Sequence, residues 1–254
     1  MGILNVTPDS FSDGGKFADV SRAIKHAREM GEAGADIIDI GGESTRPGAE
    51  PVSAEDEIQR VLPVIERVPD LPVSIDTMKS KVAARALAAG ARIVNDVSAL
   101  RFDEDMVSVV SEHGAGLVLM HMKGRPATMQ QAPRYDDVVR EVREFLAERI
   151  EFAVARGVKK SQIAVDPGIG FGKTVEHNLK ILAQLEQFRG MGCPIVVGAS
   201  RKSFIGRQPE QRLAGSLAVA AWAVAHGANV VRVHDVAETV RVVRMIEAIQ
   251  HASS

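Results

Sequence analysis

The sequence predicts an α/β fold in which eight strand–helix units close into a single-domain (β/α)8 TIM barrel. Short β-branched runs recur along all 254 residues, and each is followed by a longer segment with helical spacing. Hydrophobic residues make up 45% of the chain but aromatic residues only 4%, so the core must consist of Val, Ile, Leu and Ala, as in parallel strands covered by helices. No linker separates the units, which favours a closed barrel over an open doubly wound sheet.

The eight units follow one another in order along the chain. Strands are expected at the apolar runs 2–6, 36–40, 72–75, 92–94, 116–120, 163–165, 194–197 and 229–233. Helices are expected at 20–34, 54–68, 79–90, 103–113, 135–157, 175–189, 211–227 and 236–250. Gly-Ala pairs such as the one at Gly114 are typical of a helix C-cap that leads into the next strand. The longest connections follow strands, which places them at the C-terminal mouth of a barrel, where active sites lie.

Charge and cysteine content exclude several kinds of partner. The formal net charge of −2 predicts no general attraction to nucleic acid or to an anionic membrane. Cys193 is the only cysteine, so no intrachain disulfide can form, and this fits a reducing compartment. We expect no signal peptide before the first strand, and the longest low-polarity run is shorter than the roughly 20 residues needed to cross a bilayer. We therefore expect a cytoplasmic protein.

Polar residues recur at the expected carboxyl ends of the strands, which share one mouth in a barrel. Each alone could be a strand-terminating polar residue or a helix N-cap. The cationic or potentially cationic ones, which suit a phosphate, are Arg46, Lys202, Arg232 and His234. The acidic and amide ones, which suit the edge of a flat nitrogen heterocycle, are Asp76, Asn95 and Asp166. We expect Lys202 and Arg232 to be exposed charges, whose replacement costs more turnover than stability.

Other catalytic motifs are absent or fail on their spacing. The segment 168–174 (GIGFGKT) is similar to a phosphate loop, but Pro167 takes the place of the first glycine. Lys173 likewise takes the place of the last glycine of a dinucleotide fingerprint. The sequence contains no HExxH, no GxSxG and no Cys/His cluster, which argues against catalytic zinc and against a serine nucleophile. Three histidines, His121, His177 and His226, are expected to be structural or solvated.

One expected helix is apolar or small nearly all round. It begins at Leu213 and ends at Ala225, with the sequence LAGSLAVAAWAVA. A helix of this composition is buried on more than one face. One face can meet the barrel, and we expect the other to meet a second subunit in a homodimer. Cover by a neighbouring helix and a loop is the alternative.

Seven motifs resemble the signatures of the dihydropteroate synthase family of pterin-binding enzymes, in the order of that family and over nearly the whole chain. They are MGILNVTPDSFSDGG at 1–15, DIGGESTRPGA at 39–49, SIDT at 74–77, NDVSA at 95–99, DPGIGFGK at 166–173, GASRKSFIG at 198–206 and RVHD at 232–235. The resemblance implies that 6-hydroxymethyl-7,8-dihydropterin diphosphate and 4-aminobenzoate condense to 7,8-dihydropteroate and diphosphate, with Mg2+ as cofactor. This step belongs to folate biosynthesis and is the target of sulfonamides.

The same resemblance assigns residues to subsites. The pterin would be held by Asp76, Asn95, Asp166 and Lys202, with Val97 and Met120 packed against its ring. The diphosphate would be held by Asn5, Arg46, Arg232 and His234, with Mg2+ bridging Asn5 and phosphate oxygens. The 4-aminobenzoate would contact Phe11, Thr45, Arg46, Pro47, Phe171, Lys202 and Ser203. The residues assigned to catalysis are Lys202, Arg232, His234 and Asp13.

The implied mechanism requires no covalent nucleophile. Cations assist the departure of diphosphate, and the aniline nitrogen then attacks the pterin methylene carbon. The loop that carries Phe11 and Asp13 would close over the site, and Thr45, Arg46 and Pro47 would form a mobile lid that frames the second substrate.

Two alternative interpretations use part of the same site. A corrinoid-dependent methyltransferase has a related pterin-binding barrel, but it would not need the Arg46 loop, the Lys202 loop and Arg232 together as anion holders. A catalytically silent folate-binding barrel is the other alternative, and an activity assay separates it from an enzyme.

Members of the family usually carry a further segment before the first strand. Here the strand begins at Met1, so we expect the bottom of the barrel to lack that closure.

Overall fold

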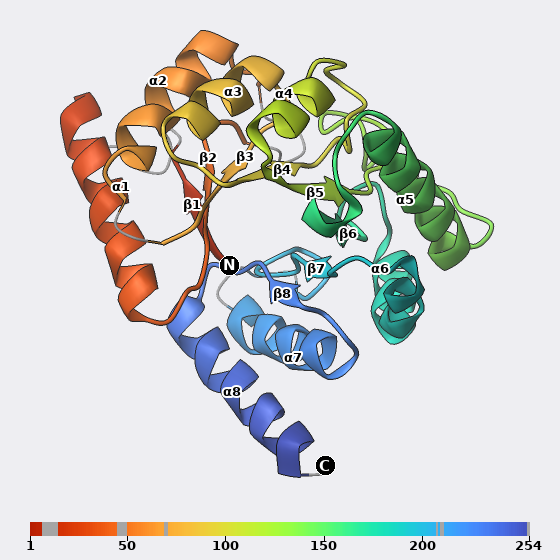
Figure 1. Cartoon of the computed structure of the whole chain (residues 1–254). Helices are drawn as coiled ribbons and strands as arrows, with labels where there is room; N and C mark the ends of the chain where they lie inside the picture. The colour runs from red at the N-terminus through yellow and green to blue at the C-terminus, as the bar shows by residue number, and fades with distance from the viewer. Residues whose placement is uncertain (7–14, 45–49, 69–70, 207, 209–210, 253–254) are drawn as a thin grey trace.

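Parallel strands form the centre of the molecule, and helices surround them (Figure 1). The computed structural model describes residues 1–6, 15–44, 50–68, 71–206, 208 and 211–252. All eight expected strands are present: β1 (Gly2–Asn5), β2 (Ile38–Gly41), β3 (Val73–Asp76), β4 (Ile93–Asp96), β5 (Gly116–Met120), β6 (Ile163–Asp166), β7 (Val196–Val197) and β8 (Val230–Val231). The predicted (β/α)8 barrel is confirmed.

Backbone hydrogen bonds join the strands in chain order. β1 to β6 form one parallel sheet, and β7 and β8 form a second parallel pair. Single bridges connect the two sheets, from Val165 to Ile195 on one side and from Gly2 to Val233 on the other. At the second bridge the N–H of Ile3 donates to the carbonyl of Val233 at 2.9 Å. The last strand therefore returns to the first, and the strands close into a barrel with all carboxyl ends on one side.

The helices lie outside the strands and connect them (Figure 1). They are α1 (Gly15–Glu32), α2 (Ala54–Ile65), α3 (Ser80–Ala88), α4 (Met106–His113), α5 (Val138–Ala155), α6 (Val175–Ala183), α7 (Arg212–Ala225) and α8 (Val236–Ala252), with short 3-10 helices η2 (Lys160–Gln162) and η3 (Leu185–Met191). Side-chain caps fix several starts; Asp137, for example, accepts hydrogen bonds from the first turn of α5. No helix in the described ranges is long and apolar enough to cross a bilayer.

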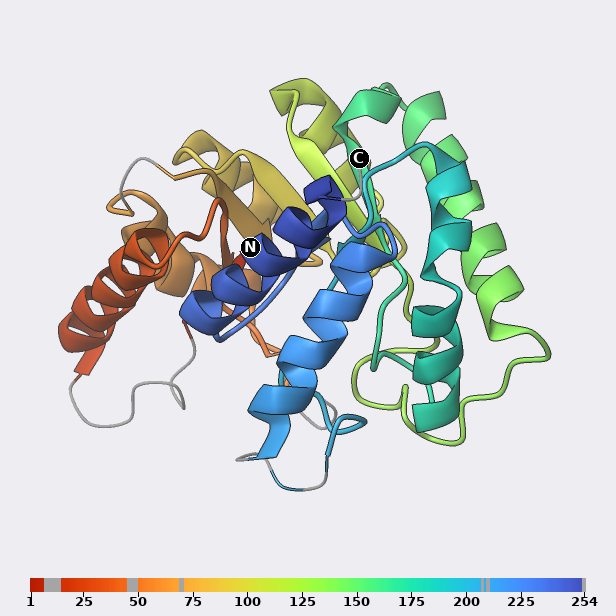
Figure 2. The same cartoon turned by 90° about the horizontal axis from the view of Figure 1, so that it is seen from below.

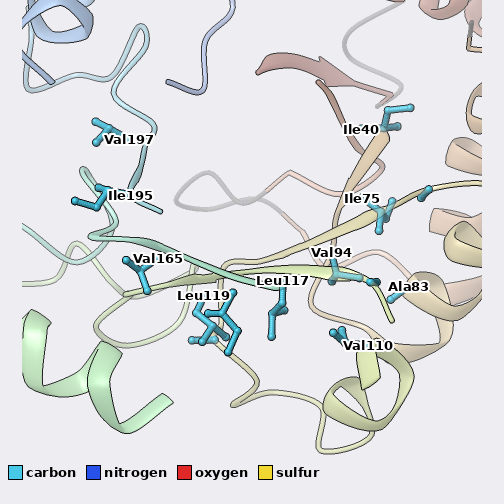
Figure 3. Close-up of a cluster of buried hydrophobic side chains, with 14 of the residues drawn as sticks. Ile40, Ile75, Ala83, Val94, Val110, Leu117, Leu119, Val165, Ile195 and Val197 are labelled. Atoms are coloured by element: carbon cyan, nitrogen blue, oxygen red, sulfur yellow. The ribbon is translucent and has the colours of Figure 1, made fainter. Parts of the chain in front are cut away.

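Alternation along the strands separates the hydrophobic core from the barrel interior. Ile40 and Ile75 are fully buried and belong to the main apolar cluster between strands and helices (Figure 3). Because successive side chains of a strand point to opposite faces, the neighbouring Asp39 and Asp76 point the other way. Both meet Arg232, which follows β8. The strand faces that do not build the core thus supply polar groups to the interior.

The expected helix at 175–189 is in fact two elements. α6 ends at Ala183, and the chain continues as the 3-10 helix η3. Leu185 and Phe188 are three residues apart and both completely buried. Side chains at this spacing eclipse one another in a 3-10 helix, so the tighter winding turns both toward the core. Three helix starts also differ from expectation: α1 begins earlier, at Gly15, whereas α4 begins later, at Met106, and α5 begins later, after the Asp137 cap.

α7 and α8 pack side by side (Figure 2). Together they leave large apolar side chains at the surface: Leu213 and Trp222 on α7, and Met245 and Ile249 on α8, are between 38% and 62% exposed. The face of α7 turned away from the barrel is therefore not covered by other described parts of this chain.

Candidate active site

Charged and amide side chains from separate strands meet at the mouth of the barrel. Asp76 and Asp166 are the last residues of β3 and β6, Asn95 is the last but one of β4, and Arg232 directly follows β8. Chain order alone brings these positions to one end, because parallel strands in a barrel all finish there. Both carboxylates are largely buried, so their hydrogen bonds and ion pairs decide what the site can do.

Arg232 forms ion pairs with two carboxylates. Its Nε donates to Asp39 Oδ2 and its Nη2 to Asp76 Oδ2, both at 2.6 Å. The Arg232 side chain is 19% exposed and Asp39 is fully buried. Burial by itself lowers the pKa of Arg232, but the charges of Asp39 and Asp76 outweigh it and raise that pKa. The expectation of an exposed charge is therefore wrong for Arg232, because two acidic partners draw its side chain into the barrel.

Asn95 joins the same cluster through its carboxamide. Its Nδ2 donates to Asp39 Oδ2 at 3.1 Å, and the residue is 5% exposed. Oδ1 of Asp39 and Oδ1 of Asp76 are also buried, and no described residue donates a hydrogen bond to either of them. Buried acceptors are normally satisfied, so these oxygens are suited to water or to a ligand that carries N–H groups.

Burial raises the pKa values of the acidic groups and so favours their neutral, protonated forms. It raises the pKa of Asp76 to about 7, against the opposing charge of Arg232 and with the help of nearby Asp39. It also raises the pKa of Asp166, although the charge of Lys202 and a hydrogen bond of 2.7 Å from the N–H of Gly168 favour the ionised form.

Lys202 lies on the loop after β7 and reaches the same mouth, where it is half-buried, so the expectation of an exposed charge is wrong for Lys202 as well. Its Nζ donates to the carbonyl of Ile169 and stands 4.4 Å from the centre of the Phe171 ring. Burial lowers the pKa of Lys202 to about 8, and the charge of Asp166 opposes this shift. Lys202 is thus a cation next to an aromatic face, with a proton that titrates near neutrality.

An apolar cluster borders the acidic edge. It consists of the buried residues Val97, Met120, Met122 and Met129. Phe171 packs against this cluster. Met120 is the register partner of Asp166 in the β5–β6 pairing, so the apolar side chains adjoin the carboxylate. Methionines adapt to irregular shapes, and such a surface suits one face of a flat ring.

Lys173 braces the loop that carries Phe171. Its Nζ donates to the carbonyls of Gly168 at 2.8 Å and Phe171 at 3.1 Å, and it lies 2.9 Å from Nδ1 of His121. Lys173 is 3% exposed, and burial lowers its pKa well below the usual value. The lysine that gives this segment its likeness to a phosphate loop therefore holds backbone carbonyls together, which agrees with the rejection of that motif. His121 has the structural role expected of it.

Three predicted site residues lie at the edge of this cluster. Asn5 ends β1, is half-buried and pairs in register with Gly41. His234 is half-buried, and its Nδ1 lies 3.0 Å from the hydroxyl of Ser200. Ser203 is exposed on the loop next to Lys202. These groups could contact a ligand that extends outward from the acidic edge.

Comparison with known proteins agrees with this geometry. The family described as pterin binding enzyme matches residues 1–234. The chain belongs to the pterin-binding enzyme family. It is 48% identical to the dihydropteroate synthase of Escherichia coli K12 over 255 residues, which cover 98% of this chain and 90% of that protein.

Solved structures of similar proteins share the fold of this pterin-binding enzyme. The Yersinia pestis dihydropteroate synthase, determined with a sulfonamide drug complex, superposes with a TM-score of 0.94 at 44% identity and covers 99% of this chain and 94% of its own. The Xanthomonas albilineans dihydropteroate synthase with 4-aminobenzoic acid gives a TM-score of 0.93 at 48% identity and covers 98% and 92%. A further structure of the Xanthomonas enzyme contains 7,8-dihydropteroate.

The pterin-binding enzyme brings most of the predicted site residues together. The predicted pterin residues Asp76, Asn95, Val97, Met120, Asp166 and Lys202 all belong to the barrel mouth described above. Five other predicted residues, which are Phe11, Asp13, Thr45, Arg46 and Pro47, lie outside the described residues. Their assignments stay predictions.

Sequence reasoning missed Asp39, which is the central acceptor of the cluster. It stands within the apolar run DIIDI, where the only signal is one carboxylate on the inward face of a buried strand. A further ionic cluster was missed nearby: Lys79 Nζ lies 2.6 Å from both Glu43 Oε2 and Glu57 Oε2. Glu43 also accepts the N–H of Val52 at 3.0 Å and so ties together both ends of the connection between β2 and α2.

Gly168 should be essential for the shape of the pterin-site loop. It has a φ of +70°, and a Cβ added there would lie 1.8 Å from the carbonyl oxygen of His121. We expect Gly168→Ala to lower the free energy of unfolding by about 2 to 5 kcal/mol, from left-handed strain plus overpacking. Gly114→Ala is the matched control, because Gly114 has a φ of +60° with open space around it, and should cost only about 1 to 2 kcal/mol. Urea unfolding measures both; equal losses would contradict the close contact.

Proposed function

We propose that this chain is a dihydropteroate synthase, which condenses 6-hydroxymethyl-7,8-dihydropterin diphosphate with 4-aminobenzoate. The observation that carries the proposal is the mouth of the barrel, where the hydrogen-bond acceptors of Asp76, Asn95 and Asp166 adjoin an apolar wall. Relatives with this name share 46% to 48% of the sequence over nearly its full length.

The acidic edge suits the pterin ring. A reduced pterin carries an exocyclic amino group and ring N–H groups along one edge, and these are donors. Ionised carboxylates accept only, so Asp76 and Asp166 complement such an edge and would reject a ring that presents acceptors there. Val97 and Met120 would cover one ring face, and Lys202 would reach the ring from the β7 loop.

The mouth also fits a magnesium ion that arrives with the diphosphate. Mg2+ takes oxygen ligands, keeps several waters and uses only one or two protein groups beside substrate phosphates. Asn5 offers a carboxamide oxygen at the end of β1. The described residues contain no group of three or more His, Cys, Asp or Glu that could form a resident metal centre. Asn5 would hold the ion, which when bound neutralises charge on the departing diphosphate.

The reaction transfers the pterin methylene from oxygen to nitrogen. The bond between the methylene carbon and the bridging oxygen breaks, and its electron pair leaves with the diphosphate. The cationic carbon is conjugated with the electron-rich pterin ring and lies near the carboxylates of Asp76 and Asp166, which favour positive charge. The amino nitrogen of 4-aminobenzoate then forms the new C–N bond and releases a proton. His234, Arg232 and Asn5 are proposed contacts of the diphosphate.

The 4-aminobenzoate is proposed to bind at the outer side of Lys202. Lys202 and the hydroxyl of Ser203 lie on the loop after β7, and Phe171 faces them from the loop after β6. A carboxylate can accept from the hydroxyl and the cation while the ring packs on Phe171. The Xanthomonas albilineans enzyme has been determined with 4-aminobenzoic acid, which supports this second substrate.

We also propose a homodimer built on α7. Its outward face exposes Ala214, Ala218 and Trp222, next to the exposed Met245 and Ile249 of α8. Apolar side chains gathered on adjacent helices are typical of a subunit interface. A cytoplasmic location fits the same proposal and stays a prediction.

The enzyme assay tests the proposed reaction directly. Diphosphate should be released only when the pterin diphosphate, 4-aminobenzoate and Mg2+ are all present. Lys202→Ala should lower kcat/KM by about 10- to 100-fold, since it removes charge-assisted contacts. Lys81→Ala is the control, because Lys81 is an exposed lysine on α3 and should retain activity. Folded protein that releases no diphosphate would leave the silent barrel as the better interpretation.

The pH profile of kcat/KM should be bell-shaped. Asp76 accepts N–H groups at both of its oxygens, and with a negative charge, only when ionised, so activity should rise as the pH passes about 7. Lys202 is a cation only when protonated, so activity should fall as the pH passes about 8. Lys202→Arg should extend the alkaline side of the profile, because a guanidinium stays charged. A flat profile from pH 6 to 9 would show that these groups do not titrate in the reaction.

Light scattering tests the dimer. The wild type should give a mass of about 54 kDa, twice the 27.2 kDa of the chain. Ala218→Glu places a charge on the outward face of α7 and should shift the mass toward the monomer. Leu179→Glu, at a 54% exposed site on α6, is the control and should not. A monomeric wild type would refute the interface.

A further inference from the structure

Asp39 is a fully buried carboxylate that holds two site residues on one oxygen. Its Oδ2 accepts hydrogen bonds from Arg232 Nε at 2.6 Å and from Asn95 Nδ2 at 3.1 Å. The three residues come from β2, from β4 and from the segment after β8. A single atom therefore determines how two side chains from distant parts of the chain lie relative to each other.

The hydrogen bond to Asp39 determines which way round the Asn95 carboxamide lies. A carboxylate that is ion-paired with an arginine can only accept hydrogen bonds, so the atom of Asn95 that faces it must be the NH2 group. The carboxamide oxygen is then the group that Asn95 offers elsewhere, and among the described residues nothing donates to it. Asn95 thus presents an acceptor, like the carboxylates of Asp76 and Asp166.

The contact with Arg232 protects a second acceptor. Arg232 shares its guanidinium between Asp39 and Asp76, with one N–H group on each. A guanidinium without the first partner can turn and place two parallel N–H groups on a single carboxylate. Oδ1 of Asp76, to which no described residue now donates, would then accept from Arg232 and would no longer be available to a ligand.

We infer that Asp39 is a positioning residue for the pterin: it holds Asn95 with its oxygen outward and Arg232 on one oxygen of Asp76, and so selects a ligand edge rich in N–H donors. The inference rests on the proposed function, because it takes the ligand of this edge to be the pterin. Asp39 acts through Asn95 and Arg232 and need not touch the reacting atoms.

Two substitutions separate the shape of Asp39 from its charge. Asp39→Asn keeps the shape and an oxygen that can accept from both partners, but it removes the charge. Asp39→Ala removes both bonds. The dissociation constant for 6-hydroxymethyl-7,8-dihydropterin should rise by about 10- to 100-fold in Asp39→Ala and by about 3- to 10-fold in Asp39→Asn. At saturating pterin diphosphate, the Michaelis constant for the second substrate, 4-aminobenzoate, should change by less than about twofold in both variants.

Ser74→Ala is the matched control. Ser74 is the register partner of Asp39 on β3, is completely buried, and its hydroxyl has no partner among the described residues. Its replacement disturbs the same layer of the barrel but removes no hydrogen bond to Asn95 or Arg232, so pterin affinity should stay within about twofold.

A double-mutant cycle with Asn95→Ala tests whether Asp39 acts through Asn95. Asp39→Ala should weaken pterin binding less in the Asn95→Ala background than in the wild type, because one of the two positioned groups is already missing. Fully additive losses would overturn the inference, and so would an equal loss in Ser74→Ala.

If Asp39→Ala does not fold, the isosteric Asp39→Asn decides, and unchanged pterin affinity overturns the inference. Wild-type protein that does not bind the dihydropterin would refute the proposed function as well, whereas wild-type binding with unaffected Asp39 variants refutes only the positioning role.

Discussion

The ion pairs of Arg232 with Asp39 and Asp76 are the interaction on which the barrel mouth depends. They connect the segment after β8 with residues 193 and 156 positions earlier in the chain. The β7–β8 pair meets the six-stranded sheet through single bridges, so a side-chain link across the mouth complements sparse backbone pairing. Removal of one member of a buried ion pair leaves the other uncompensated, which is the costly case. Closure of the barrel and arrangement of the site are therefore coupled.

One acidic and one basic group of the mouth, Asp76 and Lys202, titrate near neutral pH before any ligand arrives. Asp76 and Lys202 have pKa values of about 7 and 8, displaced in opposite directions from their usual values by the same cause, burial. A donor-rich ring edge favours ionised Asp76, and an anionic group favours charged Lys202. Binding of the donor-rich edge therefore favours proton release from Asp76, whereas binding of the anionic group favours proton uptake by Lys202, so the two contributions oppose each other.

Local sequence patterns predicted most of the fold and most of the strand ends that form the site. Strand order in a barrel places Asp76, Asn95 and Asp166 at one mouth without tertiary information, and the structure brings them there. Asp39 could not be found in this way, because its importance lies in partners far away in sequence, and its own run predicts only an ordinary buried strand. The error over the exposure of Arg232 has the same cause. Pairing across the barrel leaves no periodic signal in the chain.

The alternation of Asp39 with Ile38 and Ile40 makes strand register and recognition inseparable. A slip of β2 by one residue would turn the carboxylate into the apolar layer and an isoleucine into the barrel interior. The same exchange would occur on β3, where Asp76 follows Ile75. A barrel assembled in the wrong register could therefore neither pack nor bind, and a ligand that binds only the correct register adds its binding free energy to the correctly folded state. A bound substrate would therefore stabilise the barrel in the correct register relative to a barrel in the wrong register.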